Sequence, residues 1–171
     1  FLMDKPVIYG NEYAAKTLEQ FYDKEDISVM SPTKVISSED TIEFGDFNIS
    51  FEHAPGHSDC SMLININDTY LHIGDLYLKT DEGRDVLPFV KWAGVESHIA
   101  SLKKILCFKD RKFLISHGNC PLHTNEVKEG IDNRIKYLKA LIDSENRISA
   151  EDAVKECSKP FEFLHWRTQV K

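Results

Sequence analysis

Three places in the sequence share one pattern, in which a β-rich run enters a turn and a side chain able to bind a metal stands at the end of that run. His57 lies in Ala-Pro-Gly-His-Ser, Asp75 ends His-Ile-Gly-Asp, and His117 lies in Ile-Ser-His-Gly. Zinc, iron and manganese accept imidazole nitrogen and carboxylate oxygen as ligands. Side chains at strand ends are held rigidly at the rim of a sheet. Each segment alone is typical of an ordinary turn, but the three in this order predict side chains that converge on a metal site.

These segments resemble the metallo-β-lactamase superfamily over roughly residues 45–120, and the flanking helices resemble the second half of its αββα sandwich. The resemblance implies an α/β fold of the layered α+β kind, incomplete at its N-terminus. It also implies that His57 binds a first metal ion, that His117 binds a second, and that Asp75 bridges both and is the catalytic residue. The implied cofactors are two divalent ions, zinc first and iron or manganese as alternatives. They would polarise a carbonyl or phosphoryl oxygen and lower the pKa of a bridging water.

One part of the family pattern is absent. The His-x-His-x-Asp-His loop should lie upstream of Val7, yet the first histidine is His53 and the chain begins with Phe1 rather than Met. Three explanations stay open: the loop lies outside this sequence, another chain supplies it, or the protein has lost it. Without the loop each ion has two protein ligands, whereas a catalytic zinc usually has three. We therefore expect weak metal binding, no activity in this chain alone, and a missing N-terminal half or a homo-oligomer partner.

The leading hypothesis is a metal-dependent hydrolase with an undefined small-molecule substrate, which is an ester, thioester, lactone, lactam or phosphodiester. A non-catalytic interaction module and a redox member that binds two irons are the alternatives. Tyr77, Phe89 and Trp92 lie in a long aromatic loop and are candidate pocket residues, although plain packing explains them equally well. His123 is a candidate pocket wall or a helix-entry residue. Fold by itself does not select among the substrates.

Two further histidines have simpler interpretations. His72 stands three residues before Asp75, where it could support that carboxylate from behind or be a half-exposed strand residue. His98 is expected at the surface or facing a partner.

The elements that must position these side chains follow from hydrophobic periodicity. Alternation predicts strands at 47–53, at 62–66 and at 69–73, the last two joined by an Asn-Asp turn. Further short strands are expected at 7–9 and 112–116. Helical spacing predicts one helix over 12–23, one capped by Ser97, one after Thr124, and a short one capped by Ser149. Interleaved strands and helices indicate an α/β or layered α+β class.

Composition sets the remaining limits. The 171 residues suit a single domain, and 21 basic against 28 acidic residues give a net charge of −7. That balance disfavours nucleic-acid binding, which depends on neutralising phosphates. No run approaches the ~20 apolar residues that span a bilayer, so no membrane span is expected. Four cysteines without a C-x-x-C pair favour reduced thiols and a cytoplasmic protein.

Overall fold

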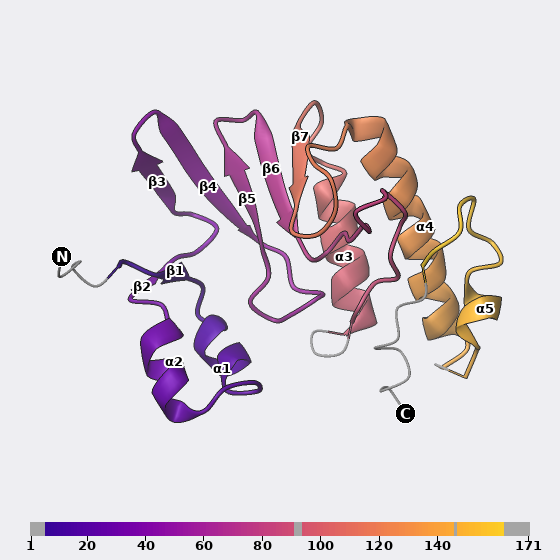
Figure 1. The fold of residues 1–171 in the computed structure, drawn as a ribbon, viewed down its shortest axis with the longest axis horizontal. Coiled ribbons are helices and arrows are strands. Elements are labelled where there is room, and N and C mark those ends of the chain that lie inside the picture. Colours follow the sequence, from indigo (N-terminus) through magenta and orange to yellow (C-terminus); the bar gives the residue numbers. More distant parts are fainter. Residues whose placement is uncertain (1–5, 91–93, 146, 163–171) are drawn as a thin grey trace.

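A five-stranded sheet with two long helices against one face organises the chain (Figure 1). The computed structural model describes residues 6–90, 94–145 and 147–162. The strands are β1 (Tyr9–Gly10), β2 (Lys34–Val35), β3 (Thr41–Phe44), β4 (Phe47–His53), β5 (Met62–Ile66), β6 (Tyr70–Gly74) and β7 (Lys112–Ile115). The helices are α1 (Ala14–Leu18), α2 (Lys24–Met30), α3 (Val95–Ile105), α4 (Thr124–Asp143) and α5 (Ala150–Ala153).

The large sheet has the order β3-β4-β5-β6-β7, with antiparallel pairing from β3 to β6 and a parallel pair between β6 and β7. The predicted turn between β5 and β6 is confirmed, since Asn67 and Asp68 adopt φ values of 52° and 51°. Positive φ at two successive residues is what a type I′ turn requires, and the Thr69 N–H closes this turn by donating to the Ile66 carbonyl at 3.0 Å. The parallel β7 follows because α3 crosses over between β6 and β7. β3 was not predicted.

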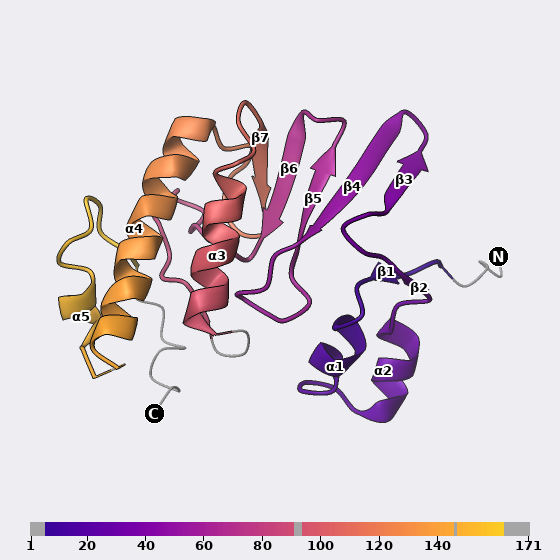
Figure 2. The ribbon, with the colours of Figure 1, turned by 180° about the vertical axis from the view of Figure 1, so that it is seen from behind.

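The core lies between the sheet and the helices α3 and α4, which Figure 2 shows in front of the sheet. Apolar residues of α3 recur at helical spacing at Ile99, Leu102 and Ile105, and all three are buried. The strand and α4 residues that share this cluster are Leu63, Leu71, Ile73, Phe113, Ile115, Val127, Ile131, Tyr137 and Leu138. The sheet is therefore anchored to both helices through its central and β7-side strands.

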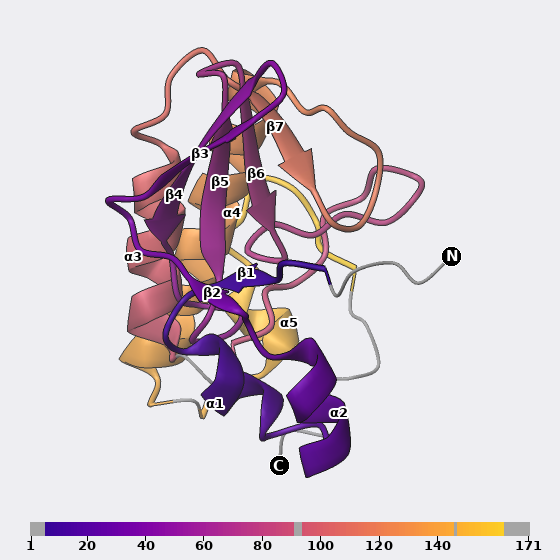
Figure 3. The same ribbon diagram turned by 90° about the vertical axis from the view of Figure 1, so that its left-hand side faces the viewer.

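The opposite side of the sheet, which we call the open face, carries no helix within the described residues (Figure 3). Strand register places its side chains in cross-strand rows, such as Phe51 opposite Ile64 and Ile64 opposite His72. The open face consists of Ile42, Phe44, Phe47, Ile49, Phe51, His53, Met62, Ile64, Ile66, Tyr70, His72, Lys112 and Leu114. Most of these side chains are apolar and only half-buried, and Phe44 is 72% exposed. A face of this kind is typical of an interface.

The segment before β3 differs from the prediction. The expected helix over 12–23 is replaced by the short α1 and by a second helix, α2, which begins after Asp23. The Asp23 carboxylate accepts hydrogen bonds from the backbone N–H groups of Glu25 and Asp26, both at 3.0 Å. Tyr13 attaches this segment to the sheet by stacking on His53, with 4.8 Å between ring centroids. The expected strand at 7–9 is the two-residue β1.

The other predicted helix starts mostly hold. α4 begins at Thr124, and α5 is capped by Ser149, whose hydroxyl accepts from the Asp152 backbone N–H at 3.1 Å. The expected cap at Ser97 is wrong, because α3 begins two residues earlier, after Gly94. Within the described residues, no helix combines the length and the apolar character needed to cross a membrane.

Candidate functional site

The three predicted ligands meet at the end of the sheet where β4, β6 and β7 finish. The Asp75 carboxylate lies between the two imidazoles, with its Oδ2 3.6 Å from His57 Nε2 and its Oδ1 3.7 Å from His117 Nε2. The side chains of His57 and Asp75 are about 70% buried, whereas that of His117 is 69% exposed. Each carboxylate oxygen therefore faces a different histidine.

The turn that carries His57 is held against α3. A Cβ atom on Gly56 would lie 2.9 Å from His98 Cα and 2.8 Å from a Leu76 methyl carbon, so only glycine fits there. The Ser101 hydroxyl of α3 donates to the Pro55 carbonyl at 2.6 Å. These contacts fix the backbone immediately before the histidine.

The turn that carries Asp75 is held by the same helix. Gly74 has φ +51°, and the pairing of β6 with β7 shifts register beside it, which turns the chain toward the site. The ring of His98 is hydrogen-bonded through Nε2 to the Leu76 carbonyl at 3.2 Å. The expectation that His98 lies at the surface is wrong: it is fully buried between the two ligand-bearing turns.

The turn that carries His117 packs against the loop after β6. The Lys79 backbone N–H donates to the His117 carbonyl at 3.3 Å. Gly118 has φ +98°, and a Cβ atom there would lie 2.8 Å from Lys79 Cβ. The loop after Asp75 therefore also positions the second histidine.

Electrostatics keeps the inner imidazole in its ligand form. Burial lowers the pKa of His57, the Asp75 charge opposes that shift, and His117 adds to it. The pKa of His72 is lowered in the same way by burial, again opposed by Asp75. Neutral imidazole is the form that binds metal ions. Asp75 Oδ1 is buried and accepts no hydrogen bond from the described residues.

This geometry fits two ions that share Asp75. Two ligand atoms about 2.0–2.2 Å from one tetrahedral zinc lie about 3.3–3.6 Å apart, close to the two nitrogen–oxygen separations here of 3.6 and 3.7 Å. Both separations are too long for hydrogen bonds. The donor set is nevertheless incomplete, because each ion would have two protein donors. Accordingly, the described residues contain no group of three or more His, Cys, Asp or Glu side chains arranged around one ion.

A cavity of about 560 Å³ opens in front of the three ligands. Phe89, predicted as a pocket residue, lies in its wall with its ring centroid 5.6 Å from that of His57. Phe21, from the segment after α1, was not predicted and also lines the cavity. The other lining residues are Leu78, Lys79, Thr80, Asp81 and Val86.

The remaining predicted pocket residues do not line this cavity. Tyr77 is fully buried in the core, where the Arg134 guanidinium lies 3.6 Å from its ring centroid and the backbone of Gly130 packs against its hydroxyl end. His123 is exposed and immediately precedes α4, which agrees with the helix-entry interpretation. Trp92 lies outside the described residues.

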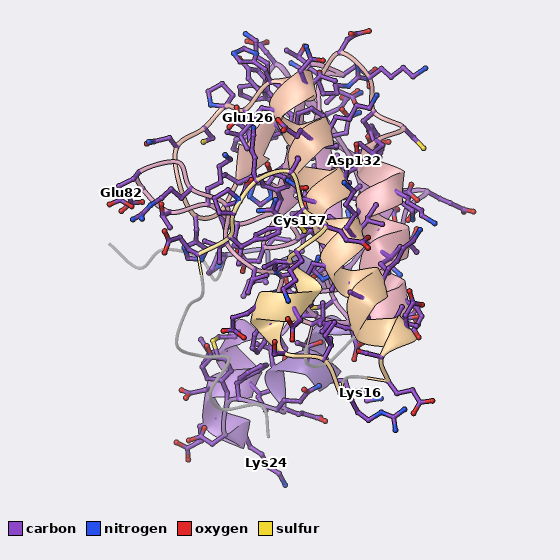
Figure 4. The ribbon with its side chains drawn as sticks, turned by 90° about the vertical axis from the view of Figure 1, so that its right-hand side faces the viewer. Lys16, Lys24, Glu82, Glu126, Asp132 and Cys157 are labelled. Carbon is purple, nitrogen blue, oxygen red and sulfur yellow. The ribbon has the colours of Figure 1, made fainter. Side chains whose placement is uncertain are left out.

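Behind the cavity, a buried charge network fixes the loop over residues 76–87. Arg134 of α4 is completely buried and donates to the Leu78 carbonyl at 2.6 Å and to Asp85 at 3.2 Å. Lys79 Nζ lies 2.9 Å from Glu126 Oε1 and 3.6 Å from Asp85 Oδ1. Figure 4 shows Glu126 at the start of α4 and Glu82 projecting from the outer tip of the loop. The loop is thus tied to α4 at its base.

Comparison with known proteins identifies the fold. No protein-family model and no curated protein matches the chain. Among solved structures, a metallo-beta-lactamase from Pontibacter korlensis matches with a TM-score of 0.56 and 16% identity, covering 72% of this chain and 55% of that one. A metallo-beta-lactamase family protein from Thermus thermophilus matches with a TM-score of 0.53 and 15% identity, covering 80% and 55%. ETHE1 from Myxococcus xanthus matches with a TM-score of 0.50 and 18% identity, covering 74% and 58%.

These matches confirm the expected layered α/β fold as that of metallo-β-lactamase superfamily structures. The chain spans between 55 and 58% of the length of the three structures. At such identities the likeness establishes the fold, and the chemistry has to be argued from the site itself.

Proposed function

We propose that this chain, which has the metallo-β-lactamase fold, is part of a metal-dependent hydrolase. His57 and His117 would each bind one of two divalent ions, and Asp75 would bind both. The observation that carries the proposal is the Asp75 carboxylate, which turns one oxygen toward each imidazole at 3.6 and 3.7 Å. Zinc is the first choice because it accepts imidazole and carboxylate together, with iron and manganese as alternatives.

When bound, such ions supply a water of lowered pKa and polarise the substrate oxygen. The residues of this chain hold the donors in place and shape the space in front of them. Burial keeps the His57 imidazole neutral and ready to bind. Phe89 packs beside that ring, with 5.6 Å between the ring centroids.

We also propose that a second β-sheet, encoded by sequence outside these 171 residues, covers the open face and supplies the remaining donors. Two features support this. The open face is apolar yet half-exposed, and each ion has only two donors where three are usual. Analytical ultracentrifugation tests the first feature. The 171-residue chain should self-associate, and a cooperatively melting monomer would contradict the proposal.

The central test compares metal content and hydrolysis rate in three proteins: the complete polypeptide that carries these residues, its Asp75→Asn variant and its Asp81→Asn variant. Asp81 also lines the cavity but contacts neither histidine, so it is a matched control. Chelator-sensitive hydrolysis of p-nitrophenyl acetate or bis-p-nitrophenyl phosphate is expected. Asp75→Asn should lose its metal. Its hydrolysis rate should fall by more than roughly 100-fold, the effect of removing a residue that only supports a metal ligand. Asp81→Asn should retain both its metal and its rate.

The alternatives give different results in the same experiment. Equal, metal-independent hydrolysis in all three proteins would refute the hydrolase. A complete polypeptide with no metal and no turnover would indicate the interaction module. Two irons with a reversible redox change and no hydrolysis would indicate the redox member.

A further inference from the structure

The cavity in front of the metal ligands has an apolar side. Phe21 and Phe89 stand at its mouth, and Leu78 and Val86 form its buried floor. The floor is rigid, because Val86 N–H donates to the Leu78 carbonyl at 3.1 Å and Arg134 holds that same carbonyl. A substrate group that lies on this side meets carbon atoms rather than hydrogen-bonding groups.

Away from the two proposed metal ions, the described side chains that line the cavity offer no free cation to an anionic group of a substrate. Within the described part of the chain, Lys79 is the only lysine or arginine that lines it. Its ammonium group is directed into the network behind the cavity, where it meets Glu126, Asp85 and the Gly83 carbonyl, and its side chain is 8% exposed. A phosphate or a carboxylate is normally recognised by a cation free to donate to it. Asp81 adds a further negative charge at the rim.

We propose that the site takes an ester or thioester whose acyl part is an uncharged apolar chain or ring, and that this part lies against Phe21 and Phe89. The inference rests on the proposed function and adds the substrate class to it. In the reaction, the oxygen of water forms a bond to the carbonyl carbon and the carbon–oxygen or carbon–sulfur bond breaks. The proton released by water passes to the leaving alkoxide or thiolate, which gives a carboxylic acid and an alcohol or thiol.

Phe21 is the specificity-determining residue in this arrangement. It is 52% exposed, which is unusual for phenylalanine, and it reaches the cavity from the segment between α1 and α2. The chain just before α1 is attached to the end of β4 through the Tyr13–His53 stack and to the turn after β4 through a 3.2 Å hydrogen bond from the Asn11 amide to the Cys60 carbonyl. An acyl chain in the cavity would cover the exposed part of the Phe21 ring.

The first experiment measures kcat/KM of the complete polypeptide for p-nitrophenyl acetate and p-nitrophenyl hexanoate, which differ by four methylenes. Full burial of one methylene corresponds to a factor of about four. A cavity that is open on one side should yield about half of the free energy of full burial, which corresponds to a factor of about two per methylene. Over four methylenes we therefore expect a preference in kcat/KM for the hexanoate of about 10-fold or more. Phe21→Ala should reduce the preference to about 3-fold, and Phe21→Leu should retain most of it.

Tyr22→Ala is the matched control. Tyr22 neighbours Phe21 and has a similar exposed fraction, 47%, but does not line the cavity. Its variant should keep the preference. The inference would be overturned if the unaltered protein showed no preference for the hexanoate. It would also be overturned if Phe21→Ala and Phe21→Leu both left that preference unchanged. A higher kcat/KM for bis-p-nitrophenyl phosphate than for the hexanoate would likewise overturn it.

A binding measurement separates this inference from the hydrolase proposal. Saturation-transfer NMR with 2-octanone on the metal-free complete polypeptide should show contact with the alkyl chain that is lost in Phe21→Ala and kept in Tyr22→Ala. Alkyl binding of this kind without any hydrolysis would support the apolar subsite and refute the hydrolase. Hydrolysis without alkyl binding or chain-length preference would refute the subsite alone.

Discussion

The buried His98 predicts a loss of stability in mild acid. Burial lowers its pKa to about 4, and the charges of Arg134 and of a protonated His57 act in the same direction, while hydrogen bonds to the Leu76 and Gly56 backbone oppose it. In the unfolded chain its pKa is near 6.5. The folded state therefore favours the neutral ring, and the unfolded state takes up a proton first as the pH falls.

The sign and the size follow from linkage. The contribution of His98 to the free energy of unfolding is fully present above pH 6.5 and is lost progressively as the pH falls from 6.5 toward 4. A difference of about 2.5 pH units at about 1.4 kcal/mol per unit amounts to about 3 kcal/mol. This is a large share of the ~5–15 kcal/mol by which domains are stable.

Urea unfolding followed by fluorescence at several pH values between 7.5 and 4.5 measures this loss. Carboxylates and the other buried histidines titrate in the same range, so the quantity of interest is the difference between wild type and His98→Gln. The glutamine amide can still donate to the Leu76 carbonyl but does not titrate. Wild type should lose about 2–3 kcal/mol more than the variant. His123→Gln, at an exposed histidine, should follow wild type. Parallel pH profiles for wild type and His98→Gln would refute the reasoning.

Three further predictions concern close contacts around the site. Arg134→Met leaves the Asp85 carboxylate buried without its guanidinium partner and should lower the free energy of unfolding by about 3–5 kcal/mol. Adding Asp85→Asn to this variant should restore part of the loss. Urea unfolding of the single and the double variant measures both effects. Gly130→Ala places a methyl group against the Tyr77 hydroxyl and should lower stability by about 1–3 kcal/mol, seen as a lower thermal midpoint. Gly118→Ala strains a residue at φ +98° and presses on the facing loop, so it should displace His117. Calorimetric titration should then show weaker zinc binding, and an unchanged zinc affinity would contradict this prediction.

The strands were predictable where apolar and polar residues alternate along the chain. β4 alternates Phe47, Ile49 and Phe51 with polar residues, and the β5–β6 turn has residues suited to positive φ. α2 gave no such signal, because none of its residues is fully buried and its sequence has no apolar stripe. The sequence signal for α2 is local. An Asp that can cap a helix, Asp23, is followed by acidic residues in the first turn, Glu25 and Asp26, and this pattern is typical of a helix start.

The buried polar residues were missed for a different reason. His98 stands at helical spacing with Val95, Ile99 and Leu102, on the apolar side of α3, and Arg134 lies three residues beyond Ile131 of α4. His98 was interpreted from its residue type, which indicates the surface, rather than from its place in the stripe, which indicates the core. For Tyr77 pocket lining and plain packing were left open, because its loop has no period from which burial could be inferred, and the structure agrees with packing.

The proposed metal ligands sit at strand ends, yet the helices hold the turns that present them. Ser101 of α3 binds the Pro55 carbonyl before His57, and His98 binds the Leu76 carbonyl after Asp75. Arg134 of α4 fixes the loop whose Lys79 backbone N–H holds the turn of the third ligand. Each of these contacts lies within the described residues, so they order the three donors without any contribution from the open face. If the 171-residue chain binds metal weakly, the physical reason is a shortage of donors and not a lack of order in those present.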